Sequence, residues 1–141
     1  MNILDTRTLS ERREALKQEI LDDFLENFPH YEEMTESFED IRFEEEEIES
    51  WKEYFEEELK EIEEINSLEV ELGSEFEYGV NLVDVDDFED YCEELMEEFG
   101  YINKDTPQLI KNNIDYKGIA EDMKQDYSEV TYQGNSYLGR G

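Results

Sequence analysis

The sequence has very little cysteine, histidine and basic charge for its 141 residues. Because Cys92 is the single cysteine, an internal disulfide is excluded and a reducing compartment is the default expectation. His30 is the single histidine, and Glu33 is the one neighbour at metal-ligand spacing, so histidine-based metal motifs are excluded. No apolar run is long enough for a signal peptide or a membrane span, so we expect neither.

Lys and Arg number 12 against 43 Asp and Glu, which gives a formal net charge of -31. Such a surface repels nucleic acid and anionic membranes, so we expect neither as a direct partner. A protein that itself binds nucleic acid would instead be attracted to this acidic surface. Ordinary domain surfaces carry a net charge of about 2–8, so solubility alone does not explain this excess. The aromatic fraction of 13% indicates a folded protein rather than a disordered acidic tail.

Motifs for catalysis and cofactor binding are missing from the sequence. There is no phosphate-binding loop, no G-x-S-x-G and no basic aromatic patch. Asp84 begins a run similar to a calcium loop, but Phe88 and Glu89 stand where a ligand and a glycine are required. Cys92 lies on the apolar face of a predicted helix, which favours a buried hydrophobe over a nucleophile. We therefore expect no enzyme, no cofactor and no bound metal.

Hydrophobic periodicity predicts three helical segments in the N-terminal half. A first helix is expected over about residues 9–27, with Thr8 as the N-cap of a capping box and Pro29 after its end. A short middle helix is expected within 29–43. The longest helix is predicted over 44–65, and its apolar stripe consists of Ile48, Trp51, Phe55, Leu59, Ile62 and Ile65. This stripe can pack on the first helix as an antiparallel pair or on a second copy as a coiled coil.

The C-terminal half has a different character. Residues 67–85 read as a linker with a short strand near its end. A helix is predicted to begin at about residue 88 and to stop at Gly100, and Asp115 is the expected cap of a second helix. Residues 129–138 predict a β-hairpin with its turn at 133–135.

These elements predict a mainly α (α+β) protein in two parts. Residues 1–66 are expected to form an acidic helical hairpin or bundle. Residues 67–141 are expected to form a small unit of two helices and a C-terminal β-hairpin.

Carboxylates are concentrated in the long helix and in the helix that follows residue 84. Between residues 44 and 65, Lys52 and Lys60 alone oppose the Glu residues. Like charges one helical turn apart destabilise a helix by roughly 0.2–0.5 kcal/mol per pair, which indicates selection for something other than folding. Such carboxylates lie about 5–6 Å apart, near the spacing of phosphates along a strand.

The charge pattern therefore predicts a protein that imitates DNA and fills the cleft of a DNA-binding protein. The acids predicted to bind this partner are Glu44, Glu45, Glu46, Glu47, Glu49, Glu53, Glu56, Glu57, Glu61, Glu64, Asp84, Asp86, Asp87, Glu89, Asp90, Glu93, Glu94, Glu97 and Glu98.

Two other functions remain open from the residues alone. One is an acidic helical scaffolding protein whose charge only keeps it in solution, and the other is an acidic chaperone for a basic protein. Mimicry predicts binding to a DNA-binding protein that weakens steeply as salt is added, which separates it from the scaffold. The apolar stripe of residues 48–65 is long for one partner helix, so a homodimer is expected.

Three segments carry a family resemblance: DDFEDYCEELMEEFGYI, IDYKGIAEDMKQDYSEV and TYQGNSYL. Together they resemble the C-terminal part of ArdA-type antirestriction proteins of phages and mobile elements, over about residues 76–138. The resemblance implies an elongated, dimeric DNA mimic that occupies the DNA-binding groove of type I restriction-modification enzymes in the bacterial cytoplasm. Residues 8–65 are expected to replace the family's other domains. That leaves a CRISPR effector or another host-defence nuclease open as the target.

Overall fold

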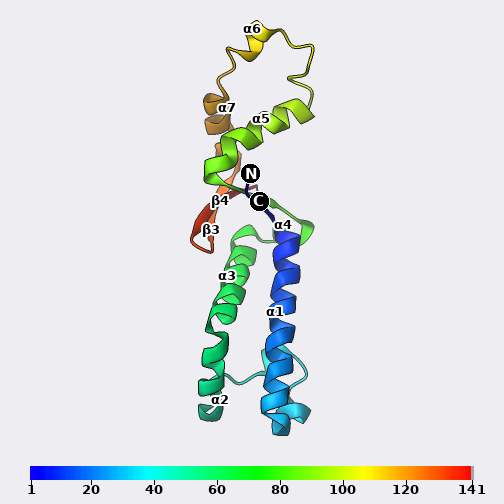
Figure 1. Ribbon diagram of the computed structural model, residues 1–141, viewed down its shortest axis with the longest axis vertical. Helices are drawn as coiled ribbons and strands as arrows, with labels where there is room; N and C mark the ends of the chain where they lie inside the picture. The colour runs from blue at the N-terminus through cyan, green and yellow to red at the C-terminus, as the bar shows by residue number, and fades with distance from the viewer. Residues whose placement is uncertain (141) are drawn as a thin grey trace.

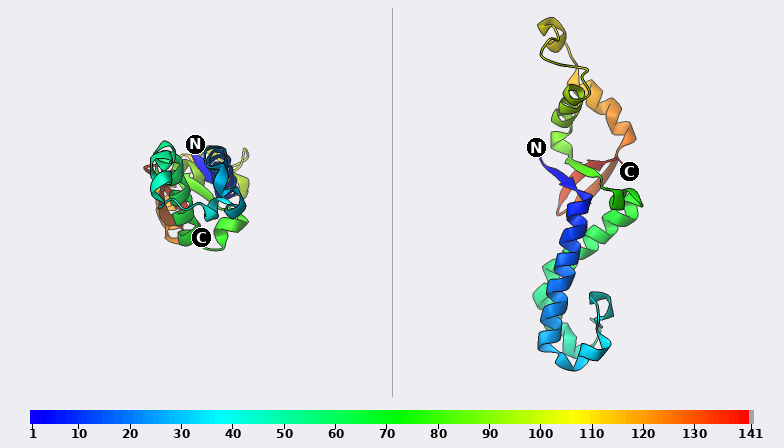
Figure 2. Two further views of the ribbon diagram at one scale, coloured as in Figure 1. Left: turned by 90° about the horizontal axis from the view of Figure 1, so that it is seen from below. Right: turned by 90° about the vertical axis from the view of Figure 1, so that its right-hand side faces the viewer.

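The computed structural model describes residues 1–140 and shows an elongated molecule with three regions (Figure 1). A hairpin of long helices forms one end, a sheet lies in the middle, and short helices form the other end (Figures 1 and 2). The α-helices are α1 (Thr6–Asn27), α2 (Glu46–Lys52), α3 (Glu56–Leu72), α4 (Glu75–Tyr78), α5 (Phe88–Glu98), α6 (Gln108–Lys111) and α7 (Tyr116–Met123). The strands are β1 (Ile3–Asp5), β2 (Asn81–Asp84), β3 (Ser128–Tyr132) and β4 (Asn135–Gly139). These elements confirm the mainly α (α+β) class.

Helix α1 begins two residues before the predicted cap. The Asp5 carboxylate accepts a hydrogen bond from the Arg7 backbone N–H at 2.9 Å and so caps the first turn. The predicted cap at Thr8 is therefore wrong. The residues just before the helix form β1, which pairs with β2 in an antiparallel ladder. The predicted end before Pro29 is confirmed.

The acidic stretch predicted as one helix forms two helices, α2 and α3, separated by the 3₁₀ turn η3 (Glu53–Phe55). Helix α3 continues to Leu72, into residues expected to be a linker. The segment 29–43 contains two 3₁₀ turns, η1 (Pro29–Met34) and η2 (Phe38–Asp40), rather than one short α-helix.

The apolar stripe packs against the first helix, so the antiparallel pair is the one observed of the two pairings that the sequence left open. Ile48 and Trp51 are buried with Phe24 of α1, and Ile62 belongs to the same cluster. The stripe is therefore largely covered before any second copy binds, which removes the reason originally given for a homodimer.

The four strands form one antiparallel sheet in the order β1-β2-β4-β3. Tyr132 pairs with Asn135, so a turn of two residues joins β3 to β4. Gln133 and Gly134 both have positive φ, 53° and 78°, as a type I′ hairpin turn requires. The predicted C-terminal hairpin and the strand before residue 85 are confirmed, and β1 is an addition.

A buried cluster joins the base of the helical hairpin to the sheet. Its members are Leu9, Ile65, Leu68, Leu72, Phe76, Val80, Leu82, Val130, Tyr132 and Tyr137. The fully buried Thr6 hydroxyl adds polar contacts, donating to the Phe76 carbonyl at 2.9 Å and accepting from the Val80 N–H at 2.8 Å. Helix α3 and this cluster both cross residue 66, and the division of the chain there into two folding units stays a prediction.

Helices α5 and α7 cover the other side of the central region. Phe88, Cys92 and Ala120 are buried there together with Leu138 of β4. Gly100 follows α5 with φ 79°, and Asp115 accepts from the Gly118 N–H at 3.0 Å, so both predicted helix boundaries are confirmed. The burial predicted for Cys92 is confirmed as well, and this burial raises the pKa of its thiol.

Candidate partner-binding surface

The predicted acids of the helical hairpin are mostly exposed along α2, η3 and the start of α3. Because the apolar stripe of these elements faces α1, their remaining faces are free to carry charge. Eight of the predicted acids are exposed here: Glu44, Glu45, Glu46, Glu47, Glu49, Glu53, Glu56 and Glu57. We call these eight acids the exposed row, and the α2 helix that carries several of them lies at the end of the hairpin away from the sheet (Figure 1).

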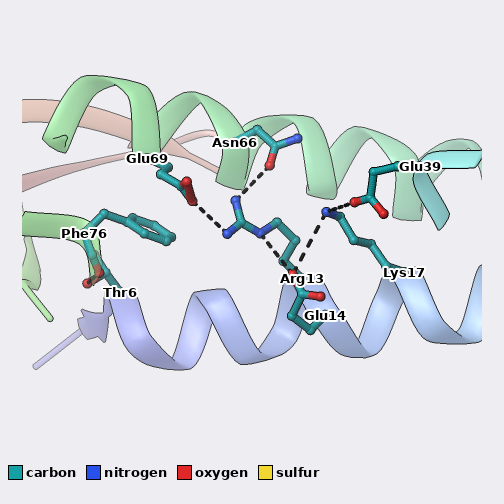
Figure 3. A network of polar contacts seen from close by, with 8 residues as sticks. All are labelled: Thr6, Arg13, Glu14, Lys17, Glu39, Asn66, Glu69 and Phe76. Atoms are coloured by element: carbon teal, nitrogen blue, oxygen red, sulfur yellow. Dashed lines mark hydrogen bonds and ion pairs between the residues drawn. The ribbon is translucent and has the colours of Figure 1, made fainter. Parts of the chain in front are cut away.

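The basic residues of α1 contact acids of neighbouring elements. Arg13 pairs with Glu69 of α3 at 2.7 Å. Lys17 pairs with Glu39 of η2 at 2.6 Å, and this pairing lowers the pKa of Glu39 (Figure 3). Positive charge on this helix is thus engaged within the hairpin and does not neutralise the exposed row on α2, η3 and α3.

Arg13 is the centre of these contacts. Its side chain is 12% exposed and also donates to the Asn66 side-chain oxygen at 2.8 Å. The guanidinium lies over the Phe76 ring, 5.5 Å from its centroid, in a cation–π arrangement. Figure 3 shows this guanidinium reaching from α1 to α3 beside the Phe76 ring. Arg13 therefore links the two long helices where both approach the sheet.

Two predicted acids of α3 are engaged with the β3–β4 turn. Arg12 donates to Glu61 at 3.1 and 3.3 Å, and the Tyr132 hydroxyl donates to the same carboxylate at 2.9 Å. The hydrogen bonds from Arg12 and then from Tyr132 lower the pKa of Glu61. Glu64 accepts from the backbone N–H of Gln133 at 3.3 Å and from its side-chain amide at 2.7 Å. Both carboxylates therefore face the sheet rather than open solvent.

At the far end of the hairpin, Glu47 contacts two aromatic side chains. The Tyr31 hydroxyl donates to its carboxylate, and His30 Nε2 lies 3.3 Å from the same oxygen. These contacts, Tyr31 first, lower the pKa of Glu47 and raise that of Tyr31. The His30 side chain is 61% exposed.

The predicted acids around α5 divide into two groups. Six are exposed: Asp86, Glu89, Asp90, Glu94, Glu97 and Glu98. Asp84, Asp87 and Glu93 are partly buried. Asp84 accepts from the Asp86 N–H at 2.9 Å, and Asp87 accepts from the Asn2 N–H at 2.7 Å. Asp84 caps the 3₁₀ turn η4 (Val85–Asp87), and Asp87 holds the start of the chain against the sheet.

The acids of α1 and of the hairpin end were not among the predicted site residues. The exposed ones are Glu11, Glu14, Glu19, Asp22, Glu26, Glu32, Glu33, Glu36, Glu39 and Asp40. Basic residues lie among them in the sequence, and this mixture conceals how acidic the helix is. Helical spacing could have identified the acids of α1, because Leu9, Leu16 and Ile20 face inward whereas Glu11, Glu14 and Glu19 between them face outward.

In the part of the chain that the structure describes, no helix is long and apolar enough to cross a membrane. Among residues 1–140, no three His, Cys, Asp or Glu side chains converge as metal ligands.

The molecule is thus an elongated acidic protein, with exposed carboxylates on α2, η3, α3 and α5 and with Arg12, Arg13 and Lys17 of α1 paired to acids within the hairpin. A family model for the antirestriction protein ArdA matches residues 6–137. The chain therefore belongs to the ArdA family of antirestriction proteins, which are inhibitors of type I restriction enzymes and not enzymes themselves. Because the match includes the N-terminal helices, the expected replacement of residues 8–65 is wrong. Searches of curated proteins and of solved structures gave no match.

Proposed function

We propose that the protein inhibits a type I restriction-modification enzyme by imitating DNA and occupying its DNA-binding cleft. The observation that carries this proposal is the exposed row of carboxylates on α2, η3 and α3, next to a helix whose Arg13 and Lys17 are engaged by other acids. A cleft built to bind phosphates presents basic side chains, which such a row attracts.

The shape of the molecule supports the same function. Duplex DNA carries one charge per about 1.7 Å of axis, so 31 net charges correspond to about 50 Å of duplex. A compact globule of this length has a radius of gyration of only about 14 Å. The elongated arrangement instead spreads the acidic rows of the hairpin and of α5 along one direction (Figure 1).

The partner is a DNA-binding host enzyme, and the inhibitor acts in the bacterial cytoplasm where that enzyme meets incoming DNA. The protein makes no direct contact with nucleic acid, because its charge repels the phosphates. A CRISPR effector, which also binds DNA in a basic channel, is the comparison target. Tighter binding to the type I enzyme is expected.

We propose that the homodimer contact lies at the end of the molecule opposite the helical hairpin, around α6, which we call the distal end (Figure 1). Phe99, Tyr101 and Leu109 are 66%, 75% and 76% exposed there. In the sequence of this end, Lys104 and Lys111 outnumber acidic side chains over residues 99–113. Two chains of charge -31 therefore repel each other least at this end, while the apolar side chains favour contact.

A matched pair of variants tests the proposed surface. The surface variant replaces Glu53, Glu56 and Glu57 by Gln. The control variant removes the same charge from exposed positions elsewhere, as Glu121→Gln, Asp126→Asn and Glu129→Gln. We expect the surface variant alone to inhibit the type I enzyme poorly and to bind it with a weaker salt dependence. Equal losses in both variants would contradict a defined binding face and leave only a net-charge effect.

A further inference from the structure

The contact between α3 and the β3–β4 turn uses two acids of the acidic helix for a purpose other than surface charge. The Glu61 side chain is 19% exposed and accepts from Arg12 of α1 and from Tyr132 of β3. One helical turn further on, Glu64 accepts twice from Gln133 in the turn. A pair of carboxylates on one face of α3 therefore binds the tip of the β-hairpin.

The residue bound by Glu64 has an unusual backbone. Gln133 has φ 53°, the left-handed region that a residue with a Cβ seldom adopts. A type I′ turn ordinarily uses Asn, Asp or Gly at this position. The two hydrogen bonds from Gln133 to Glu64 offset the cost of this conformation only while α3 lies beside the turn.

The contact of Glu61 and Glu64 with the β3–β4 turn lies between the two acidic parts of the molecule. Below it in Figure 1 lies the helical hairpin with its exposed acids, and above it lie the sheet and α5 with the second acidic group. Tyr132 is 7% exposed and belongs to the same buried cluster as Ile65 and Leu68 of α3. The angle between the hairpin and the sheet thus depends on how α3 sits against β3.

We propose that Glu61 and Glu64 are positioning residues, which fix the helical hairpin against the sheet and so hold the two acidic groups in the relative orientation that the target cleft accepts. This inference rests on the proposed function, since orientation matters only if both groups bind one surface. It separates these two carboxylates from Glu53, Glu56 and Glu57, which act through their charge. Preorganisation of this kind raises affinity because less orientational freedom is lost on binding.

A variant that changes no charge tests the proposal. Tyr132→Phe together with Gln133→Ala removes the hydrogen bonds that side chains of the β-hairpin donate to Glu61 and Glu64, and leaves the Arg12–Glu61 pair and every carboxylate in place. Tyr78→Phe with Gln125→Ala is the matched control, because both of these side chains are exposed and make no hydrogen bond within residues 1–140. Circular dichroism and a thermal melt of the full chain establish that each variant is folded.

Binding to the type I enzyme is then measured across a salt series. We expect the Tyr132/Gln133 variant to bind about tenfold more weakly, as follows if the competent orientation falls to about one tenth of the population. The slope of log affinity against log salt should stay unchanged, because that slope reflects the number of charges engaged. Glu57→Gln should lower the slope. A lower slope for the Tyr132/Gln133 variant, or unchanged affinity, would overturn the positioning role.

A distance measurement tests, without the enzyme, whether this contact fixes the helical hairpin against the sheet. Spin labels on cysteines introduced at Ser50 of α2 and Lys117 of α7 report the separation of the two ends, and buried Cys92 stays unlabelled. We expect one narrow distance distribution in the parent chain and in the control, each diluted with unlabelled chain so that a dimer carries labels on one copy. We expect a broad one in the Tyr132/Gln133 variant. Equal widths in the parent chain and the Tyr132/Gln133 variant would show that the contact does not fix the hairpin against the sheet. If the variant's distribution is broad but the parent chain does not bind the enzyme, the positioning role stands and the proposed function is rejected.

Discussion

The indole N–H of Trp51 donates to the Asp23 carboxylate at 2.6 Å and so connects α2 to α1. Trp51 is 8% exposed and packs in the buried cluster of the hairpin. Asp23→Ala leaves the indole N–H without this acceptor, and we expect a loss of about 1–3 kcal/mol in the free energy of unfolding. Urea denaturation followed by Trp51 fluorescence measures it.

The neighbouring acid provides the control for that variant. Within residues 1–140, Asp22 is exposed and accepts only from Gln18 on the same helix, so Asp22→Ala should cost about 0.2–0.5 kcal/mol. The two variants remove the same charge from adjacent positions. Equal losses would show that the Trp51–Asp23 contact contributes nothing beyond net charge.

The buried cluster at the base of the hairpin predicts how the two parts of the chain unfold. Leu68 is 1% exposed among residues of α3, β3 and β4. We expect Leu68→Ala to lower the free energy of unfolding by about 2–5 kcal/mol, whereas Val70→Ala, at an 84% exposed position of the same helix, should change little.

Urea unfolding of the parent chain also tests whether the chain divides into two folding units at residue 66. If residues 1–66 and 67–141 fold as separate units, helix loss and loss of Trp51 fluorescence should occur at different urea concentrations. A single coincident transition would show one cooperative unit.

Acid should weaken the contact at Glu61. Hydrogen bonds, from Arg12 first, hold the pKa of Glu61 below its usual value of 4.5 in the folded protein. A lowered folded pKa means that the unfolded chain binds the proton more readily, so the stabilisation is complete above the usual value and is lost as pH falls through the folded pKa. The difference in unfolding free energy between the parent chain and Glu61→Gln should therefore shrink from about pH 7 to about pH 3. A difference that grows on acidification would contradict this assignment.

The apolar distal end predicts a dimer that one added charge disrupts. Sedimentation at physiological salt should show two copies of the parent chain and one copy of Leu109→Asp, because a buried carboxylate at a symmetric contact faces its own copy. Tyr54→Asp adds the same charge at an 83% exposed position of the helical hairpin and should remain dimeric. A parent chain that is monomeric even at high salt would rule out the homodimer.

Local patterns in the sequence predicted the elements whose signals lie within a few residues. The Asp115 cap, Gly100 at the end of α5 and the Gln133-Gly134 turn are of this kind. Strand β1 was missed because its partner β2 lies far away in the sequence and its three residues carry no period of their own. Helix α3 was ended too early, since Leu68 and Leu72 become core residues only when the sheet packs on them.

The sequence predicted that the candidate site consists of acidic residues, but it did not predict which of these acids are exposed. Helical spacing placed Glu53 and Glu57 correctly outside the apolar stripe. Nothing in the spacing distinguished Glu61 and Glu64, because their partners Tyr132 and Gln133 come from the far end of the chain. The inward engagement of Arg13 likewise depends on tertiary packing against Asn66 and Phe76.

Competition with DNA tests the central claim most directly. Labelled duplex is bound to a type I restriction-modification enzyme at low salt, and the protein is added in increasing amounts. Mimicry predicts that duplex is released, that more protein is required when more duplex is present, and that no complex holding both is found. A stable complex of enzyme, duplex and protein together, with the enzyme still inhibited, would contradict occupation of the DNA-binding cleft.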